Sequence, residues 1–313
     1  MRDLAVDNAV SVFVDQPLAE GLGPRPALVT PGGACTYDEL AALTSRAARA
    51  LRELGVEAEQ RVAIFMPDGI GFAVTFFAAL RLGAVAVPLN TRLPAKSLRF
   101  ILDDCRAKVL VTDGGLTVSL DGRSRARAVT FEELMKGPDG GPLGAEPVGG
   151  DAMAFWLYTS GTTGTPKAAM HCHRNLLACH LYAEGVLEVS AEDRVFSTSK
   201  LFFAYALGNA LTIPLYARAS AYLHPAWMDP AAVLGVLRSY RPTLFFSVPT
   251  MYGHLLRPIS RRRPSARCAS ASRRERSCPR RSTMPGGSAS AWRSSTPSAP
   301  PRRSTCSSAI APA

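Results

Sequence analysis

One ten-residue stretch of the chain combines the residue types that bind phosphate. From Tyr158 to Lys167 it contains two glycines, five serine or threonine hydroxyls and a closing Pro-Lys pair. Glycines let the backbone turn tightly and approach a ligand, and successive backbone N–H groups in such a turn form an anion-binding nest. The lysine adds a flexible point charge suited to phosphate. The predicted cofactor-binding residues are Thr159, Ser160, Gly161, Thr162, Thr163, Gly164, Thr165 and Lys167, and Lys167 is also the predicted catalytic residue.

The surroundings of this stretch distinguish it from commoner glycine loops. An apolar, aromatic run of strand length, residues 153–158, comes directly before it. It is not a Walker loop, because Thr165 and Pro166 separate Gly164 from Lys167, and the dinucleotide pattern G-x-G-x-x-G is absent. An ordinary turn between two strands is the simpler alternative. The density of hydroxyl groups beside the lysine favours phosphate binding.

Strands and helices alternate along the first 256 residues and must position this loop. Leu40, Leu43, Ala47 and Leu51 follow the spacing of an amphipathic helix, for example. Such alternation predicts the α/β class, with a helix-covered, largely parallel sheet. Strands are expected at 27–30, 61–66, 83–89, 108–112, 153–158, 219–223 and 243–247. Helices are expected at 37–54, 95–104, 131–135, 175–187 and 230–240. A further helix is expected after the strand 61–66, ending near residue 82, and another from residue 250 onward.

The loop resembles the phosphate-binding signature of the adenylate-forming, or AMP-binding, enzymes, which include acyl-CoA synthetases, luciferases and peptide-synthetase adenylation domains. Segments 37–40, 82–90 and 248–250 resemble the same family. One departure is Ala168, where these enzymes usually carry glycine. The resemblance implies a partial large domain of such an enzyme. It also implies a loop that holds the pyrophosphate of ATP while a carboxylate attacks the α-phosphate.

A second segment resembles a narrower group within that family. Residues 200–209, KLFFAYALGN, are similar to the segment that lines the aromatic-acid pocket of benzoate-type CoA ligases. By that resemblance Phe203, Ala204 and Tyr205 are the expected substrate-binding residues, and benzoate or a hydroxybenzoate is the expected acid. The alternative from the residues alone is a buried aromatic helix that packs the core.

The resemblance implies an ATP-dependent aryl-CoA ligase, which converts a carboxylate, ATP and CoA into acyl-CoA, AMP and pyrophosphate. ATP, Mg²⁺ and CoA are the expected cofactors and co-substrates, and no metal ligand is assigned to a side chain of this chain. Two alternatives stay open. One is another adenylate-forming acyl-CoA synthetase, and the other is a non-catalytic truncated fragment with a basic tail.

Composition narrows the setting in which the chain is expected to work. The N-terminus lacks the apolar core of a signal peptide, and no uncharged apolar run reaches the roughly 20 residues of a membrane helix. Seven cysteines without C-x-x-C spacing indicate free thiols, so a cytoplasmic location without membrane association is expected. His171 and His173 lack the partners of a zinc site, and a packing role is expected instead.

Residues 257–313 differ in composition from residues 1–256. They hold thirteen arginines, fourteen serines and a single acidic residue, Glu275, so they carry essentially all of the net charge of +11. Such a stretch buries too little apolar area to offset its ordering entropy, and disorder is expected. A basic tail that binds nucleic acid is one interpretation. Physiological nucleic-acid binding is not expected, because a second interpretation explains the composition better.

A shifted reading frame in GC-rich DNA produces tails of this kind. Reading the codons one base out of register permits LRVSVAAGELLPA over 267–280 and a string containing G-S-T-E over 291–313. Adenylate-forming ligases carry similar strings here, and G-S-T-E resembles their adenine and metal motif. The tail is therefore interpreted as a frameshift product. The printed chain, without that motif and the later domain with its lysine, is expected to be inactive.

The frameshift interpretation predicts the nucleotide sequence around codon 257. A one-base correction there should open a long frame that continues past codon 313 and restores the apolar periodicity that stops near Leu256. Sequencing the gene is the measurement. Stop codons soon after codon 257 in both alternative frames would contradict the interpretation.

Overall fold

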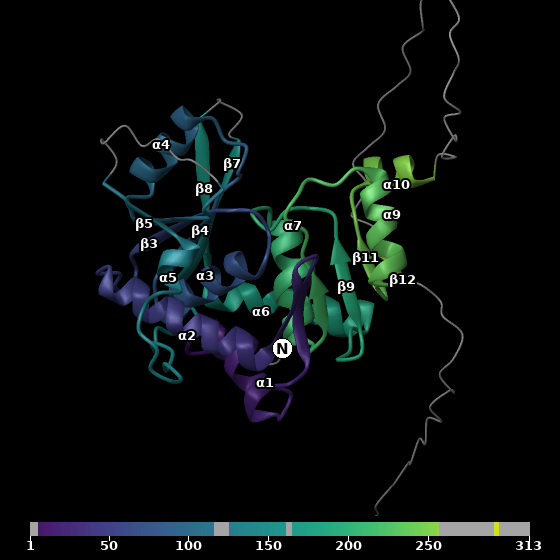
Figure 1. Cartoon of the computed structure of the whole chain (residues 1–313), viewed down its shortest axis with the longest axis horizontal. Coiled ribbons are helices and arrows are strands. Elements are labelled where there is room, and N and C mark those ends of the chain that lie inside the picture. The colour runs from purple at the N-terminus through teal and green to yellow at the C-terminus, as the bar shows by residue number, and fades with distance from the viewer. Residues whose placement is uncertain (1–5, 116–124, 161–164, 257–290, 294–313) are drawn as a thin grey trace, which may run out of the picture.

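The computed structural model describes residues 6–115, 125–160, 165–256 and 291–293. Within these ranges the strands form two six-stranded sheets. The sheets lie beside each other, with helices between them and on their outer faces (Figure 1). The α/β class with mostly parallel strands is confirmed, although the strands are divided between two sheets.

The sheet that carries the predicted phosphate loop has the strand order β6-β5-β3-β4-β7-β8. Its strands are parallel except at one edge, where β8 runs antiparallel to β7. The strands are β3 (Arg61–Phe65), β4 (Val85–Pro88), β5 (Ala107–Thr112), β6 (Arg127–Thr130), β7 (Met153–Ser160) and β8 (Pro166–Cys172).

The other sheet has the order β12-β11-β9-β10-β1-β2. Its inner strands are parallel, and each edge strand is antiparallel to its neighbour. The strands are β1 (Pro26–Thr30), β2 (Gly33–Thr36), β9 (Arg194–Ser197), β10 (Ser220–Tyr222), β11 (Leu244–Phe246) and β12 (Ala291–Arg293).

The helices begin where the local sequence supplies a cap. The longest, α2 (Tyr37–Glu53), has a capping box in which Thr36 and Glu39 each accept the other's backbone N–H. Asp229 is the N-cap residue of α9 (Pro230–Ser239), and proline is the first residue of that helix. The other helices are α1 (Gln16–Ala19), α3 (Ile70–Arg81), α4 (Ala95–Asp104), α5 (Phe131–Leu134), α6 (His173–Tyr182), α7 (Ala204–Ala206), α8 (Ile213–Tyr216) and α10 (Pro249–Leu255). Short π-helical turns are η1 (Ser11–Asp15), η2 (Ala183–Leu187) and η3 (Leu207–Thr212).

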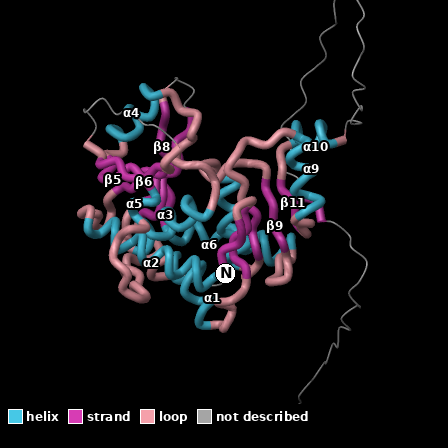
Figure 2. Tube along the Cα trace, in the orientation of Figure 1, coloured by secondary structure: helices cyan, strands magenta, loops and turns pink. Residues whose placement is uncertain are grey.

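Alternation along the strands divides the core into layers. In β3, Val62 and Ile64 face the central core together with residues of α2 and α3. Ala63 and Phe65 face the opposite side, where α4 packs. The outer face of the second sheet packs against α9 and α10, and Figure 2 shows these two helices beside β9 and β11. Among the described residues no helix is both long and apolar enough to cross a membrane.

Five strands were not expected from the sequence: β2, β6, β8, β9 and β12. Each of β2, β6 and β9 spans only four residues, too few for a period-two pattern to stand out. In β8, Pro166 and the pair Ala168–Ala169 are poor strand formers. Its extended conformation follows from pairing with β7 along its length.

One described strand lies within the segment that was expected to be a disordered tail. Residues 291–293 form β12, which pairs antiparallel with β11. The edge of β11 is therefore paired over these three residues. The remaining residues beyond 256 lie outside the described ranges.

Two histidines of α6 are buried in the core between the sheets. His173 is fully buried, and its Nδ1 accepts the Ala9 N–H at 3.1 Å, in keeping with the packing role expected for it. His180 stacks on Tyr216 with 3.5 Å between ring centroids, and neither of its ring nitrogens has a hydrogen-bond partner among the described residues. Burial lowers the pKa of His173 to about 4. Burial, with the nearby Arg218 charge, lowers the pKa of His180 to about 3.

These two histidines predict a loss of stability in mild acid. The unfolded chain binds protons below about pH 6.5, whereas the folded chain resists protonation until about pH 4 at His173. The contribution of these two histidines to the free energy of unfolding should therefore be constant above pH 7 and fall as the pH drops, by about 2 kcal/mol per histidine at pH 5. Urea unfolding at pH 7 and pH 5 measures this fall. The double variant H173N/H180F should lose most of it, whereas H254N, at an exposed histidine, should keep it. An equal fall in the parent chain and in H173N/H180F would contradict the assignment of this pH dependence to the two histidines.

Candidate active site

The candidate site lies where three parallel strands end. Asp68 follows β3, Asn90 follows β4, and Thr159 is near the end of β7. Because β3, β4 and β7 are parallel neighbours, their carboxyl ends meet at one edge of the sheet. This edge is the usual ligand position in open α/β sheets.

A cavity of about 370 Å³ opens at this edge. One wall comes from the turn after β4 and from α4. A second comes from the β7–β8 hairpin, and a third from the segment after β9, which belongs to the other sheet. The lining residues are Pro88, Leu89, Asn90, Leu93, Ser97, Ile101, Tyr158, Thr159, Pro166, Phe202 and Phe203. The cavity is thus mainly apolar, with a few polar groups, and of a size that suits a small ring-containing ligand.

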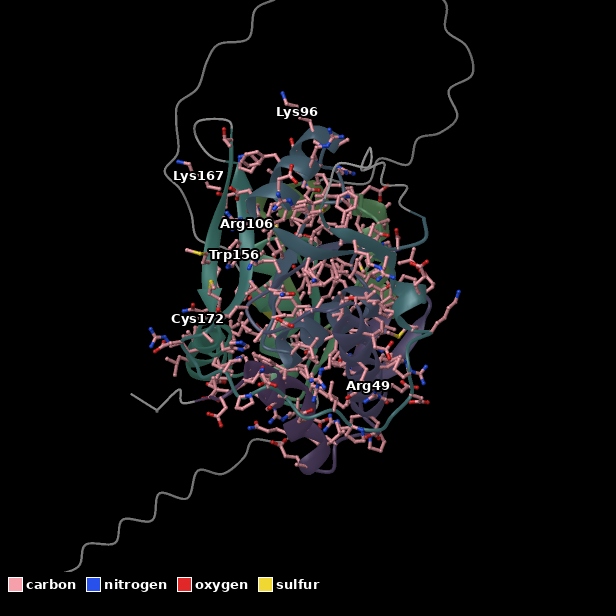
Figure 3. All side chains as sticks on the ribbon, turned by 90° about the vertical axis from the view of Figure 1, so that its left-hand side faces the viewer. Arg49, Lys96, Arg106, Trp156, Lys167 and Cys172 are labelled. Carbon is pink, nitrogen blue, oxygen red and sulfur yellow. The ribbon has the colours of Figure 1, made fainter. Side chains whose placement is uncertain are left out.

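The predicted phosphate loop is the tip of the β7–β8 hairpin. Thr159 pairs with Lys167 and Ser160 with Pro166, so the strands are held in register up to the base of the loop. Lys167 and Thr165 are exposed beside the cavity wall formed by Thr159 and Pro166. In Figure 3 the Lys167 side chain projects outward from β8. The remaining predicted loop residues, Gly161, Thr162, Thr163 and Gly164, lie outside the described residues.

Two contacts fix β7 at the base of this loop. The Tyr158 hydroxyl donates to Asp104 Oδ2 at 2.5 Å, which connects the strand to the last residue of α4. Burial and the Asp104 carboxylate raise the pKa of this phenol. On the same face of β7, the Arg61 guanidinium lies 5.7 Å from the Trp156 ring centroid. These contacts hold the loop base against α4 and β3.

The three predicted substrate residues occupy different positions. Phe203 lines the cavity and is 48% exposed. Ala204 is exposed at the start of α7. Tyr205 packs against residues of β9 and β11, and its hydroxyl donates to the Ser247 carbonyl oxygen at 3.2 Å. Only Phe203 of the three lines the cavity, together with Phe202 and with residues of the β7–β8 hairpin.

A buried ion pair lies behind this cavity wall. The Lys200 ammonium donates to the carbonyl oxygens of residues 224–226 at 2.6, 3.3 and 2.7 Å and is 3.7 Å from Asp68 Oδ2. Asp68 Oδ1 accepts the Leu201 N–H at 3.2 Å. Burial raises the pKa of Asp68 to about 6, partly offset by the Lys200 charge. Burial also lowers the pKa of Lys200, against the opposing effect of Asp68.

Sequence reasoning did not find this ion pair or the contact between Tyr158 and Asp104. The one local signal was Lys200 itself, a lysine directly before the apolar run Leu-Phe-Phe. A charged side chain there must either reach solvent or find a buried partner. Asp68 is far away in the sequence, and the partner became apparent only from the packing of the two sheets.

The family follows from comparison with known proteins. A model of the family described as "AMP-binding enzyme" matches residues 18–293. The chain belongs to this family. The match also extends beyond residue 256 to the end of β12.

Several relatives of the AMP-binding family act on aromatic acids. A 3-hydroxybenzoate–CoA ligase from Aromatoleum sp. (strain CIB) is 35% identical over 266 residues, which are 80% of this chain and 50% of that protein. A benzoate–CoA ligase from Thauera aromatica is 36% identical over 264 residues, again 80% and 50%. The chain spans about half the length of these curated relatives.

Solved structures agree with this assignment. A benzoate CoA ligase from Burkholderia xenovorans LB400 has a TM-score of 0.75 at 33% identity, over 81% of this chain and 53% of that one. ATP-bound MatB from Rhodopseudomonas palustris has a TM-score of 0.69 at 27% identity, over 80% and 52%. The two-sheet arrangement of this chain is thus that of the N-terminal part of AMP-binding enzymes.

The contact between Tyr158 and Asp104 predicts a measurable coupling at the base of the loop. Removing the hydroxyl in Y158F should lower the free energy of unfolding by about 1 kcal/mol, because a hydrogen bond to a charged acceptor is lost. A double-mutant cycle with D104A, measured by urea unfolding, isolates the pair. The two effects should be non-additive by a similar amount. Additive effects would show that the contact contributes nothing to stability.

Proposed function

We propose that this chain is the front part of an ATP-dependent aryl-CoA ligase for benzoate or a hydroxybenzoate. Two observations support the proposal. The hydroxybenzoate and benzoate ligases described above are 35–36% identical over four-fifths of the chain. In addition, Phe203 lines a cavity that touches Thr159 and Pro166 at the base of the phosphate loop. An aromatic ring in this cavity would place its carboxylate next to the loop.

The proposed reaction has two steps in a complete enzyme of this kind. A carboxylate oxygen attacks the α-phosphorus of ATP, and pyrophosphate leaves with the electrons of the broken P–O bond. The sulfur of CoA then attacks the acyl carbonyl carbon, and AMP leaves. The loop donors and Lys167 would neutralise negative charge on the pyrophosphate, which is positioning combined with electrostatic stabilisation. The predicted roles of Thr159, Ser160, Thr165 and Lys167 belong to this proposal.

Mg²⁺ belongs to the same proposal. It is a hard cation that prefers oxygen ligands and is usually held through substrate phosphates. In the described part of the loop, Thr159 and Thr165 offer hydroxyl oxygens, which fit such an ion when ATP is bound. When bound, the ion would offset charge on the phosphate oxygens. Cytoplasmic operation and a domain boundary near residue 256 are further parts of the proposal.

A second function from the family has less support. Another acyl-CoA synthetase, for an aliphatic acid, would share the fold and the loop. The aromatic residues of the cavity wall, Phe202 and Phe203, favour an aromatic acid because rings pack by stacking or edge contact.

The proposal predicts that the full 313-residue chain binds benzoate or a hydroxybenzoate in this cavity. Equilibrium binding measured by ligand-observed NMR should favour these acids over hexanoate. F203A should weaken binding by about tenfold, because one aromatic contact is lost. F100A, at an exposed phenylalanine of α4 that does not line the cavity, is the matched control and should bind as the parent does.

A second measurement separates binding from chemistry. Exchange of labelled pyrophosphate into ATP should be absent with or without benzoate, because the chain spans half of a complete ligase. Equal binding of benzoate and hexanoate, or equal binding by F203A and the parent chain, would contradict the aromatic-acid proposal. Benzoate-dependent exchange that K167A abolishes would show instead that this chain alone performs the first step.

A further inference from the structure

Lys200 lies where segments from both sheets meet. It is in the connection after β9 of one sheet, and its counter-ion Asp68 is in the connection after β3 of the other. Both residues are buried, at 5% and 6% exposure. The pair thus joins the two sheets directly behind the cavity.

The turn that carries the aromatic wall is built on this lysine. The Phe203 N–H donates to the Lys200 carbonyl oxygen at 2.9 Å, and the Phe203 carbonyl oxygen accepts the N–H groups of Ala206 and Leu207. The next residue after Lys200, Leu201, donates its N–H to Asp68. Residues 200–203 are therefore fixed to the opposite sheet through one carboxylate, and α7 begins from that fixed turn.

The same ammonium holds a second segment beside the cavity. Its three protons match the three carbonyl oxygens of residues 224–226. Trp227 follows directly, and its ring centroid lies 6.1 Å from that of Phe202. The Arg92 guanidinium lies 4.1 Å from the same Trp227 ring centroid. Lys200 thus fixes both the residue that lines the wall and the ring that supports it.

Stability alone is a weak explanation for such a pair. The cost of desolvating two charges offsets much of their attraction, and well-packed apolar residues of similar volume often serve as well. An apolar side chain could not hold three carbonyl oxygens and a carboxylate from separate segments at the same time. The arrangement instead defines a unique geometry, in which Phe202 and Phe203 face Thr159 across the cavity.

We propose that Lys200, with Asp68 as its counter-ion, is a positioning residue for the aromatic wall of the acid site. It contacts no ligand itself and acts through the placement of Phe202 and Phe203. The inference rests on the proposed function for its ligand, an aromatic carboxylate. The inference is carried by the hydrogen bonds from Lys200 to residues 224–226 and from Leu201 to Asp68. These hydrogen bonds do not depend on the proposed function.

The first test measures this geometry without a ligand. Amide hydrogen exchange of the full chain should be at least about tenfold faster in segments 198–207 and 224–229 of K200M than in the parent chain. Exchange in α2, which is remote from the pair, should stay unchanged. D68N, which keeps an acceptor for the Leu201 N–H, should give a smaller increase in the same segments. K108M is the matched control, since it makes the same substitution at an exposed lysine of β5.

The second test separates positioning from general damage. K200M should weaken binding of benzoate or 4-hydroxybenzoate by about tenfold and leave ATP binding within about twofold, because the phosphate hairpin is held by other contacts. K200R, which retains charge and donors, should recover part of the acid affinity. Equal losses of acid and ATP binding would overturn the proposal and indicate a merely structural lysine.

The two failures can be told apart. If the parent chain binds no aromatic acid, the proposed function fails, and the exchange experiment alone decides whether Lys200 positions the two segments. If exchange in segments 198–207 and 224–229 is the same in K200M, D68N and the parent chain, the positioning role is wrong, whatever acid is bound. If K200M loses protection from exchange throughout the chain, D68N decides. Exchange in segments 198–207 and 224–229 of D68N must then be faster than in the parent chain for the positioning role to stand.

Discussion

The site depends on the parallel pairing of β7 beside β4. This pairing, registered through Ala86 and Phe155, brings the end of β7 next to the turn after β4. The phosphate hairpin and Asn90 consequently share one edge of the sheet. Parallel strands that are distant in sequence need a long connection, and residues 89–152 supply it with α4, β5, β6 and α5. Without this pairing the glycine- and threonine-rich loop would have no cavity beside it.

The second requirement is that the cavity is shared between two sheets. One sheet provides the hairpin and the turn after β4, which suit the phosphates, and the other provides Phe202 and Phe203, which suit an aromatic ring. The proposed function would therefore place charge handling and ring recognition on different sheets. The same overall fold is found in a benzoate CoA ligase and in MatB.

The sequence predicted the elements with strong local patterns and missed those defined by distant partners. Helix α2 was predicted because its apolar residues repeat with the helical period, and strand β3 because it is a short continuous apolar run. The loop was predicted from its composition, and Phe203 from a family resemblance. Strand β8 was missed because its residues are extended only through β7. The pair of Asp68 and Lys200 was missed because no local pattern encodes a contact between two separate sheets.

Strand β12 shows how little a sheet edge demands of sequence. It meets β11 through backbone groups, which are the same in every residue type except proline. Ala291–Arg293 therefore serves as an edge strand, although it lies in a stretch whose composition differs from that of residues 1–256. The sequence of such an edge strand can be changed more freely than the sequence of a core strand. A short segment from a region of very different composition can therefore close the edge of an otherwise apolar sheet.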